Sequence, residues 1–369
     1  MATQGWINIF PEAKLFHLTS SVSNHSPLAL RLVRKLRNKR ARKIFRFEAM
    51  WLRNQRCEEV VQNAREEGKL TSSGCMLGSC LEKCRSKLET WNKMEFGHVG
   101  RRVTEVQKRL EWIELQPPSP AINQELKRTR VELNCWLEKE ADMWRQQSRL
   151  TWLQSGDRNT GFFHAKASAR HKKNSIEGIM DANEVWHVDD GKVEEVLVDY
   201  YKELFTTSQP TEFSEMLQTA QPKVTNSMNQ LLTRDFSAAE FRVALKQMYP
   251  LKAPGPDGMP PLFFQHFWLI CGEVVIATVL DFLNNGICPP DFNKTHIILI
   301  PKVKSPKKVT GYRPISLCNV VYKLASKTIA NRLKKILPSI ISDTQSAFVH
   351  GRLITNNVLV AFETMHHIS

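Results

Sequence analysis

Two cations near residues 300–313 have the types and spacing to hold a triphosphate. Lys302 ends the β-branched run KTHIILIPK, and Arg313 stands at the start of the returning run YRPISLC. Two such runs joined by a short loop predict adjacent strands, which would bring the two cations near one another. Arginine can bind phosphate oxygens in a bidentate manner, while lysine acts as a mobile point charge. Surface cations on hairpins are common, so this pair alone is only a weak indication of a phosphate site.

A second candidate is the segment KAPGPDG, which contains Lys252, Gly255, Asp257 and Gly258. Its prolines fix φ and its glycines permit close approach of another backbone, so the segment is expected to form a rigid turn. By itself, PGPDG indicates only a turn.

The carboxylates of this part of the chain do not suggest a catalytic metal site. Each aspartate is explained by its local position, and we expect helix capping to account for the only adjacent pair of aspartates, which precedes this part of the chain. The residues concerned are Asp257 in the turn, Asp281 on a predicted helix, Asp291 in a loop, Asp343 at a helix start, and the pair Asp189 and Asp190.

The eight cysteines do not have the regular spacing of a disulfide framework, and they are expected to remain thiols in a reducing compartment. Only Cys75, Cys80 and Cys84 cluster, with His98 as a conceivable fourth ligand. Their spacing matches no common zinc pattern, and all three could lie on helical turns. A packing role is the favoured interpretation, and zinc is the alternative.

The formal net charge of +15 favours a polyanionic partner, above all nucleic acid. Residues 31–46 are predicted to form a basic helix. A solvated face or nuclear-import signal and a phosphate-binding helix remain equally good interpretations. The basic residues of this patch are Arg34, Lys35, Arg37, Lys39, Arg40, Arg42 and Lys43.

A second basic cluster follows the turn-rich segment 155–161. It consists of Lys166, Arg170, Lys172 and Lys173, and lies beside two phenylalanines. A capped helix start with a solvated face explains it without any ligand.

The surrounding elements can be predicted from periodicity and capping. Heptad-like apolar spacing over residues 103–136, interrupted by PPSP, predicts a helical hairpin. Residues 176–191 predict a β-hairpin and a helix capped by Asp189 or Asp190, and Ser237 with Glu240 predicts a capping box at a new domain. Residues 261–286 are predicted to be mainly helical.

No apolar run is expected to reach the length of a membrane span, and the N-terminus lacks the layout of a signal peptide.

The chain closely resembles the fingers of plant LINE-type (non-LTR) reverse transcriptases in the order and spacing of four segments. These segments are KAPGPDG, LIPK, YRPISLCNVVYKLASKTIANRLK and SDTQSAFVHGRLITNN. Three earlier segments are similar to the region that joins endonuclease to polymerase in such elements. They are FRFEAMWL, WLQSGDRNTGFFHAKAS and YYKELFTTSQP. The first residues, WINIFPEAKLFHLTSSVSNHSPLAL, are similar to the closing strands of the endonuclease.

The resemblance implies an α+β protein with a helix-rich N-terminal connector, a partial fingers subdomain containing a small antiparallel sheet, and an incomplete palm. Residues 1–30 would be an endonuclease remnant, 31–150 a basic helix and helical hairpin, 151–215 a connector, and 216–369 the fingers part of the polymerase.

The resemblance also implies roles for single residues. Lys302 and Arg313 would contact nucleotide phosphates, and Lys252 to Gly258 would lie along the template. His25 matches the catalytic histidine of the endonuclease, but Asn24 replaces the aspartate that would orient the imidazole. Asn356 stands where the family usually has aspartate, with a consequence that the sequence leaves open.

Polymerisation in this family uses two Mg²⁺ ions held by clustered carboxylates, which we expect to lie beyond Ser369. The chain is therefore predicted to bind nucleic acid (an RNA template and DNA primer) without turnover, to hold no cofactor, and to bind deoxynucleoside triphosphate weakly. A non-catalytic nucleic-acid-binding protein derived from a retroelement is the alternative. An intracellular, nuclear location and no membrane partner are expected, and the oligomeric state is left open.

Overall fold

The chain divides into two compact units, Met1–Ile44 and Phe45–Ser369, which are described separately. The computed structural model describes residues 6, 13–17, 28–31, 44–71, 76–148, 160–209, 222–342, 345, 349 and 351–368.

The first unit contains a small antiparallel ribbon. Strand β1 (Lys14–His17) pairs with β2 (Leu28–Arg31), and Lys14 lies opposite Arg31. The predicted basic helix therefore does not begin at Arg31, because the backbone of this residue is used in the ladder to β1. The seven basic residues from Arg34 to Lys43 lie outside the described residues.

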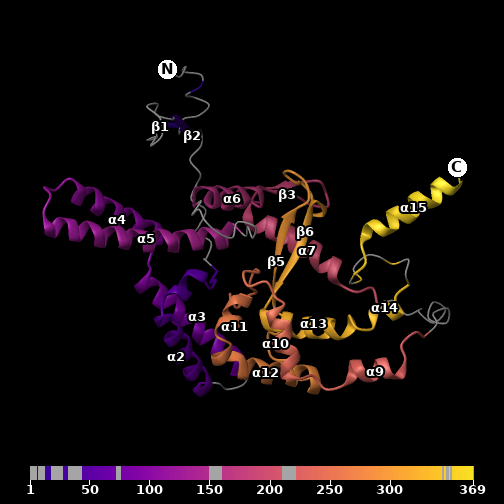
Figure 1. The fold of residues 1–369 in the computed structure, drawn as a ribbon. Coiled ribbons are helices and arrows are strands. Elements are labelled where there is room, and N and C mark those ends of the chain that lie inside the picture. The colour runs from indigo at the N-terminus through magenta and orange to yellow at the C-terminus, as the bar shows by residue number, and fades with distance from the viewer. Residues whose placement is uncertain are drawn as a thin grey trace. The chain divides into compact units, whose positions relative to one another are not determined.

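The first half of the second unit is helical (Figure 1). The predicted hairpin is confirmed as α4 and α5, which meet at the predicted PPSP break. Its seam is formed by the buried side chains of Val103, Val106 and Ile113. The elements are η1 (Ala49–Arg53), α2 (Arg56–Leu70), α3 (Met76–Glu95), α4 (Val99–Glu114), α5 (Pro120–Ser148) and α6 (Thr160–Lys173).

The second half mixes helices with two short antiparallel hairpins, which confirms the α+β class. The stretch 261–286, predicted to be mainly helical, consists of two helices that meet at Phe267, whose ψ of 27° departs from helical geometry. The elements are β3 (Ile179–Met180), β4 (Trp186–His187), α7 (Asp190–Phe205), α9 (Asn226–Thr233), α10 (Ala238–Lys246), α11 (Pro261–His266), α12 (Trp268–Asn285), β5 (Thr295–Pro301), η2 (Val309–Gly311), β6 (Tyr312–Cys318), α13 (Val320–Leu333), α14 (Leu337–Ile340) and α15 (Ile354–Ile368).

Both predicted helix starts are confirmed. The Asp189 carboxylate accepts hydrogen bonds from the backbone N–H groups of Gly191 and Lys192, at 3.0 and 3.1 Å. At α10, Glu240 accepts from the backbone N–H of Ser237 at 3.0 Å, as a capping box requires. Local side-chain chemistry therefore sets these two boundaries.

The main core joins the first helices to the later ones through the extended segment before η1. Phe47 is fully buried, and its ring lies 5.1 Å from that of Trp51 and 5.4 Å from that of Phe263. The backbone N–H of Phe47 donates to the carbonyl of Gly258 at 3.0 Å, and its carbonyl accepts from Gln146 at 2.9 Å. One short segment thus packs against η1, α5, α11 and the 252–258 turn.

Helix α12 is long and apolar enough to cross a membrane by length and composition alone, contrary to the expectation that no apolar run reaches this length. Its Val274, Val275 and Val279 are buried in the main core, and the helix packs against α13, α2 and α3. Packing inside the unit explains the apolar character of this face.

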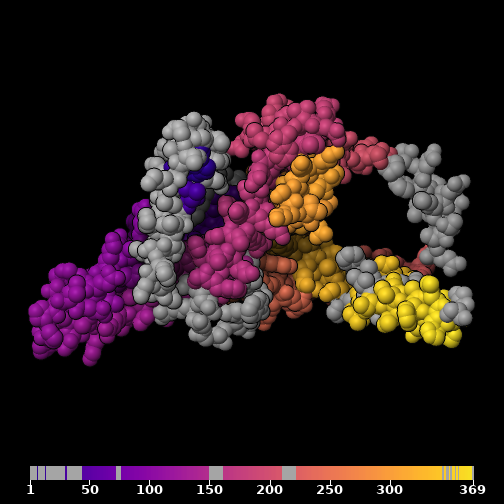
Figure 2. Space-filling view, turned by 90° about the horizontal axis from the view of Figure 1, so that it is seen from above, coloured from indigo at the N-terminus to yellow at the C-terminus, as the bar shows by residue number. Residues whose placement is uncertain are grey.

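A smaller core attaches the β3–β4 hairpin and α7 to the tip of the β5–β6 hairpin. Ile179, Tyr201, Val309 and Tyr312 form its buried centre, and the N–H of Met180 donates to the carbonyl of Lys307 at 2.8 Å. Figure 2 shows the orange tip of β5–β6 against the pink atoms of this region. The expected boundary at residue 215 therefore separates segments that share a core, and the boundary itself stays a prediction.

Arg332 on α13 anchors the start of α10. Its side chain is 3% exposed, and its guanidinium donates to both carboxylate oxygens of Glu240, at 2.8 and 3.0 Å. It also donates to the carbonyls of Leu232, Arg234 and Asp235 and lies 3.5 Å from the ring centroid of Phe236. The guanidinium holds the pKa of Glu240 down at about 2.

We predict that Phe47→Ala lowers the free energy of unfolding by about 3 to 5 kcal/mol, because a buried ring is replaced by a cavity. Urea unfolding of the full chain measures this change. Phe362→Ala is the matched control, since Phe362 is 70% exposed and its loss should change stability by less than about 0.5 kcal/mol. Equal effects would contradict the central position of Phe47.

We also predict that Arg332→Met lowers the free energy of unfolding by about 3 to 5 kcal/mol, because Glu240 and three carbonyls lose their donor. The exposed Arg242 on α10 supplies the control, Arg242→Met, with the same loss of charge. Chemical denaturation at neutral pH compares the two. A small effect at Arg332 would show that this buried cluster contributes little net stability.

Candidate functional site

The β5–β6 hairpin places Lys302 and Arg313 on one face. Arg313 lies opposite Ile300 in the register, and the N–H of Lys302 donates to the carbonyl of Gly311 at 2.8 Å. Because side chains alternate along a strand, Lys302 shares the face of Ile300 and Arg313. The two cations are therefore diagonal neighbours, which agrees with the adjacency that the sequence predicts.

The two faces of this hairpin have different surroundings. Leu299 and Tyr312 point toward the small core with α7, whereas Lys302 and Arg313 are exposed. The Lys302 ammonium donates to the carbonyl of Thr310 at 2.8 Å, and Arg313 makes no ion pair with a described residue. One side of the hairpin is thus fixed by packing, and the other presents two cations to solvent.

The 252–258 segment is a turn packed against the protein itself. A Cβ on Gly255 would lie 2.3 Å from Oδ1 of Asn319, and one on Gly258 would lie 2.5 Å from the carbonyl oxygen of Phe45. Gly258 also has a φ of +75°, which an L side chain rarely adopts. Both glycines are required here by close packing, while Lys252 is exposed.

Asp257 directs its carboxylate into this turn. Oδ1 accepts from the backbone N–H of Met259 at 3.0 Å, while Oδ2 is buried without a hydrogen-bond partner among the described residues. Burial raises the pKa of this carboxyl to about 6, against a smaller lowering by Met259 and Lys323. Asp257 is therefore an internal carboxyl that loses its proton at a higher pH than an exposed aspartate does.

Asn319 and Lys323, which were not predicted as site residues, hold this turn. Asn319 accepts from the N–H of Asp257 at 3.2 Å, and Lys323 donates to the carbonyl of Ala253 at 3.0 Å. Burial lowers the pKa of Lys323. An asparagine just before a helix indicates a simple cap, so no local pattern signals a contact with a residue 62 positions earlier.

The turn and the cationic pair lie at opposite ends of one strand. Gly255 packs where β6 meets α13, and Arg313 is at the other end of β6, five residues before Cys318. At roughly 3.3 Å per residue this separation is about 16 Å. The structure thus links the two predicted groups by a strand and does not bring them into one pocket.

Several predicted residues cannot be assigned a position. Asn24, His25, Cys75 and the seven basic residues of the 31–46 segment lie outside the described residues. Asn356 lies on α15, but its side chain is outside the described part of the chain.

Cys80 and Cys84, the described members of the predicted cysteine cluster, are packing residues. Cys80 and Cys84 are buried on α3, and their thiols lie near the carbonyls of Arg65 and Val61, at 3.5 and 3.9 Å. Burial raises the pKa of Cys84 to about 12, which disfavours the thiolate that binds zinc. Among the residues described, no group of three or more His, Cys, Asp or Glu side chains is placed to hold a metal ion.

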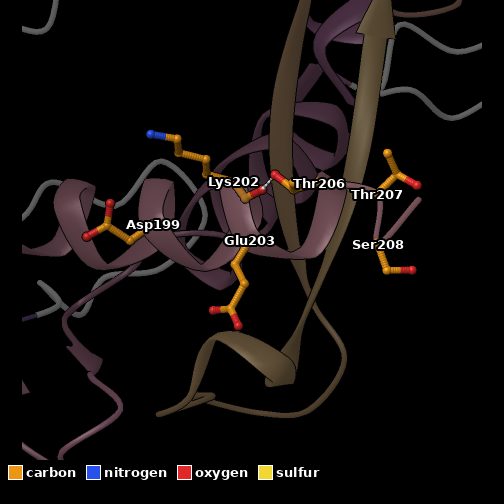
Figure 3. Close-up of a pocket in the computed structure, with 6 residues that line it drawn as sticks. All are labelled: Asp199, Lys202, Glu203, Thr206, Thr207 and Ser208. Atoms are coloured by element: carbon orange, nitrogen blue, oxygen red, sulfur yellow. Dashed lines mark hydrogen bonds between the residues drawn. The ribbon is translucent and has the colours of Figure 1, made fainter. Parts of the chain in front are cut away.

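An open hollow of about 480 Å³ lies at the C-terminal end of α7 (Figure 3). Its charged side chains point away from one another, and Thr206 donates to the carbonyl of Lys202 at 2.6 Å. The hollow therefore gathers no set of catalytic groups. It is lined by Asp199, Lys202, Glu203, Thr206, Thr207 and Ser208.

We predict that Asp257→Asn removes a pH-dependent loss of stability. The folded-state pKa of about 6 lies above the usual 3.8, so the free energy of unfolding should fall as pH rises between these values. The fall amounts to about 2 to 3 kcal/mol. Urea unfolding at pH 4 and pH 7.5 measures this change. The free energy of unfolding of the variant, relative to that of the native chain, should be higher at pH 7.5 than at pH 4.

The exposed Asp291 provides the control for this experiment, because Asp291→Asn changes the same functional group at the surface. Its stability relative to the native chain should vary little between the two pH values. Parallel curves for Asp257→Asn and the native chain would contradict the raised pKa.

Comparison with known proteins adds two findings to this geometry. Residues 300–368, from the end of β5 through α15, match the family "Reverse transcriptase (RNA-dependent DNA polymerase)". The chain is also 27% identical over 221 residues to the "Transposon TX1 uncharacterized 149 kDa protein" of Xenopus laevis. That alignment covers 60% of this chain and 17% of the relative, so the chain spans only a small part of the relative's length. By these matches, the last part of the chain is similar to reverse transcriptases, and a longer stretch is similar to a transposon protein.

Proposed function

We propose that this chain is the segment of a LINE-type, non-LTR retrotransposon protein that extends from the end of the endonuclease to the fingers of the reverse transcriptase. The observation that carries the proposal is the β5–β6 hairpin, which lies at the start of the matched segment and presents Lys302 and Arg313 on its open face. The similarity to the TX1 transposon protein supports the same assignment.

In this proposal, the two cations bind the phosphates of an incoming deoxynucleoside triphosphate. Arg313 has no acidic partner among the described residues, so its guanidinium is available to bind phosphate oxygens. Lys302 can leave the Thr310 carbonyl and follow the ligand as a mobile charge. The packed face formed by Leu299 and Tyr312 holds the strands in place while the ligand binds.

We further propose that the 252–258 turn lies along the template. Its backbone is fixed by Asn319 and Lys323, and the exposed Lys252 offers a phosphate contact. Asp257 does not serve as a ligand in this arrangement, because its carboxylate points into the protein. Its role is to shape the turn.

The described residues do not fit the Mg²⁺ pair that nucleotide transfer requires. Two such ions need several converging carboxylates, and no group of three metal-binding side chains exists within the described part of the chain. We therefore propose that these residues bind nucleic acid and triphosphate, the latter weakly, and that they hold no metal. RNA template and DNA primer are the proposed partners, and the nucleus is the proposed location.

We predict that Arg313→Gln and Lys302→Gln each weaken binding of a fluorescent dGTP analogue by at least about tenfold. Each removes a charge-assisted hydrogen bond to phosphate, which contributes about 1.5 to 3 kcal/mol. Fluorescence anisotropy of the full chain measures the affinity, with unlabelled dGTP and deoxyguanosine as competitors. Only the triphosphate should displace the probe.

The control is Lys304→Gln, which removes an exposed charge from the loop between the same strands. It should leave the affinity nearly unchanged. If all three variants bind the probe equally well, the hairpin is not the phosphate site. If RNA binding persists without any triphosphate binding, the chain is a nucleic-acid-binding protein and not a nucleotide-binding one.

A further inference from the structure

Helix α6 carries positive charge without any acidic residue. Its 14 residues include no Asp or Glu, and four of them are exposed lysines or arginines. None of these four makes an ion pair with a described residue, although Lys166 lies 5.6 Å from the ring centroid of Phe162. The four residues are Lys166, Arg170, Lys172 and Lys173.

Several acids of the neighbouring elements are paired with other residues. On α5, Glu138 and Asp142 both bind Arg53, and Asp142 also lies 3.5 Å from Arg145. In the β3–β4 hairpin, Asp181 binds His187 at 2.8 Å, and Glu184 binds Lys308 at 3.0 Å. These acids are therefore engaged elsewhere, and no described acid forms an ion pair with the four cations of α6.

In the α4–α5 hairpin, by contrast, some cations pair with acids across the two helices. Arg109 pairs with Glu132 across the two helices, and Arg130 pairs with Glu114 at 2.9 Å. A basic chain can thus balance its surface charge locally, and α6 does not. This difference separates α6 from an ordinary solvated helix face.

Helical geometry places three of the cations in a row. Lys166, Arg170 and Lys173 follow the i, i+4, i+7 spacing, which keeps side chains on one face. The orientation of the helix is fixed by Phe163, which is buried, and by His164, whose ring lies 4.4 Å from that of Trp144. Helix α6 lies on the face of the unit that is viewed in Figure 2.

Neither the helix dipole nor a membrane surface accounts for the row as well as a nucleic acid does. Cations in the last turn stabilise a helix through its dipole, but Lys166 lies about two turns before the C-terminus. A helix that lies on an anionic membrane needs an exposed apolar face, and the large apolar Phe163 of α6 is buried. A backbone of regularly spaced phosphates matches a row of cations without an apolar face.

We propose that α6 is a binding site for single-stranded RNA, whose phosphates contact the row Lys166, Arg170 and Lys173. The partly exposed ring of Phe162, beside Lys166, offers a surface on which an unpaired base can stack. The inference rests on the proposed function in one respect, that RNA is the natural partner. The site is separate from the phosphate site on β5–β6.

The test uses the full chain and a fluorescein-labelled 20-nucleotide oligouridylate, with anisotropy measured from 50 to 300 mM salt. The variant Lys166→Gln/Arg170→Gln/Lys173→Gln should bind at least about tenfold more weakly at low salt. The slope of log affinity against log salt should become shallower by about 2, because each phosphate contact on a single strand contributes about 0.7.

The matched control is Lys108→Gln/Lys127→Gln/Arg128→Gln, which removes three exposed charges from α4 and α5. It should retain nearly native affinity and slope. A conservative variant, Lys166→Arg/Arg170→Lys/Lys173→Arg, keeps the charge and should also bind. Circular dichroism and thermal unfolding identify any variant whose weaker binding comes from loss of the fold.

Any of the following results would overturn the proposal. The α6 variant could bind as tightly as the native chain, or the control could lose as much affinity as the α6 variant. Duplex RNA could compete better than the single strand. The α6 substitutions could abolish binding to phosphatidylserine vesicles while leaving RNA binding intact. If the native chain binds no RNA but still binds triphosphate at Arg313, this inference fails while the nucleotide part of the proposed function stands.

Discussion

Burial of Phe47 is the interaction on which the rest of the second unit depends. Its ring packs against Trp51 and Phe263, while its backbone bonds to Gly258. These contacts attach the first helices to the later ones and press the 252–258 turn against the start of α13. The turn can then support β6, the strand that carries Arg313. A connector and a candidate site that are distant in sequence therefore share one hydrophobic core.

Electrostatics divides the surface into balanced and unbalanced regions. In the α4–α5 hairpin, Arg109 and Arg130 pair with glutamates across the two helices, and Arg332 is buried with Glu240. The open face of β5–β6 and the row on α6 have no such partners among the described residues. Paired charges fix the positions of helices, whereas unpaired cations on fixed elements retain their attraction for phosphates. The same residue types thus serve the fold in one place and a ligand in another.

Local signals in the sequence predicted the elements well where a few neighbouring residues decide the outcome. The cap by Asp189, the capping box at Ser237, the α4–α5 hairpin and the adjacency of β5 and β6 are all confirmed. The break at Phe267 and the strand at Arg31 were not predicted, because packing and strand pairing override local propensity there. Asn319 was missed for the same reason, since its contact with Asp257 joins residues far apart in the chain.

The sequence by itself determined the charge, the order of the motifs and the likeness to reverse transcriptases, because these depend only on residue identity and spacing. Only the tertiary structure decided which groups are available to a ligand. It buried the Asp257 carboxylate and left Arg313 exposed. It also paired Asp142 on α5 with Arg53 and Glu184 in the β3–β4 hairpin with Lys308, so these acids do not pair with α6. Whether a charged side chain is available to a ligand depends on its burial and on its ion-pair or hydrogen-bond partners. Both are supplied by residues that are distant in the chain.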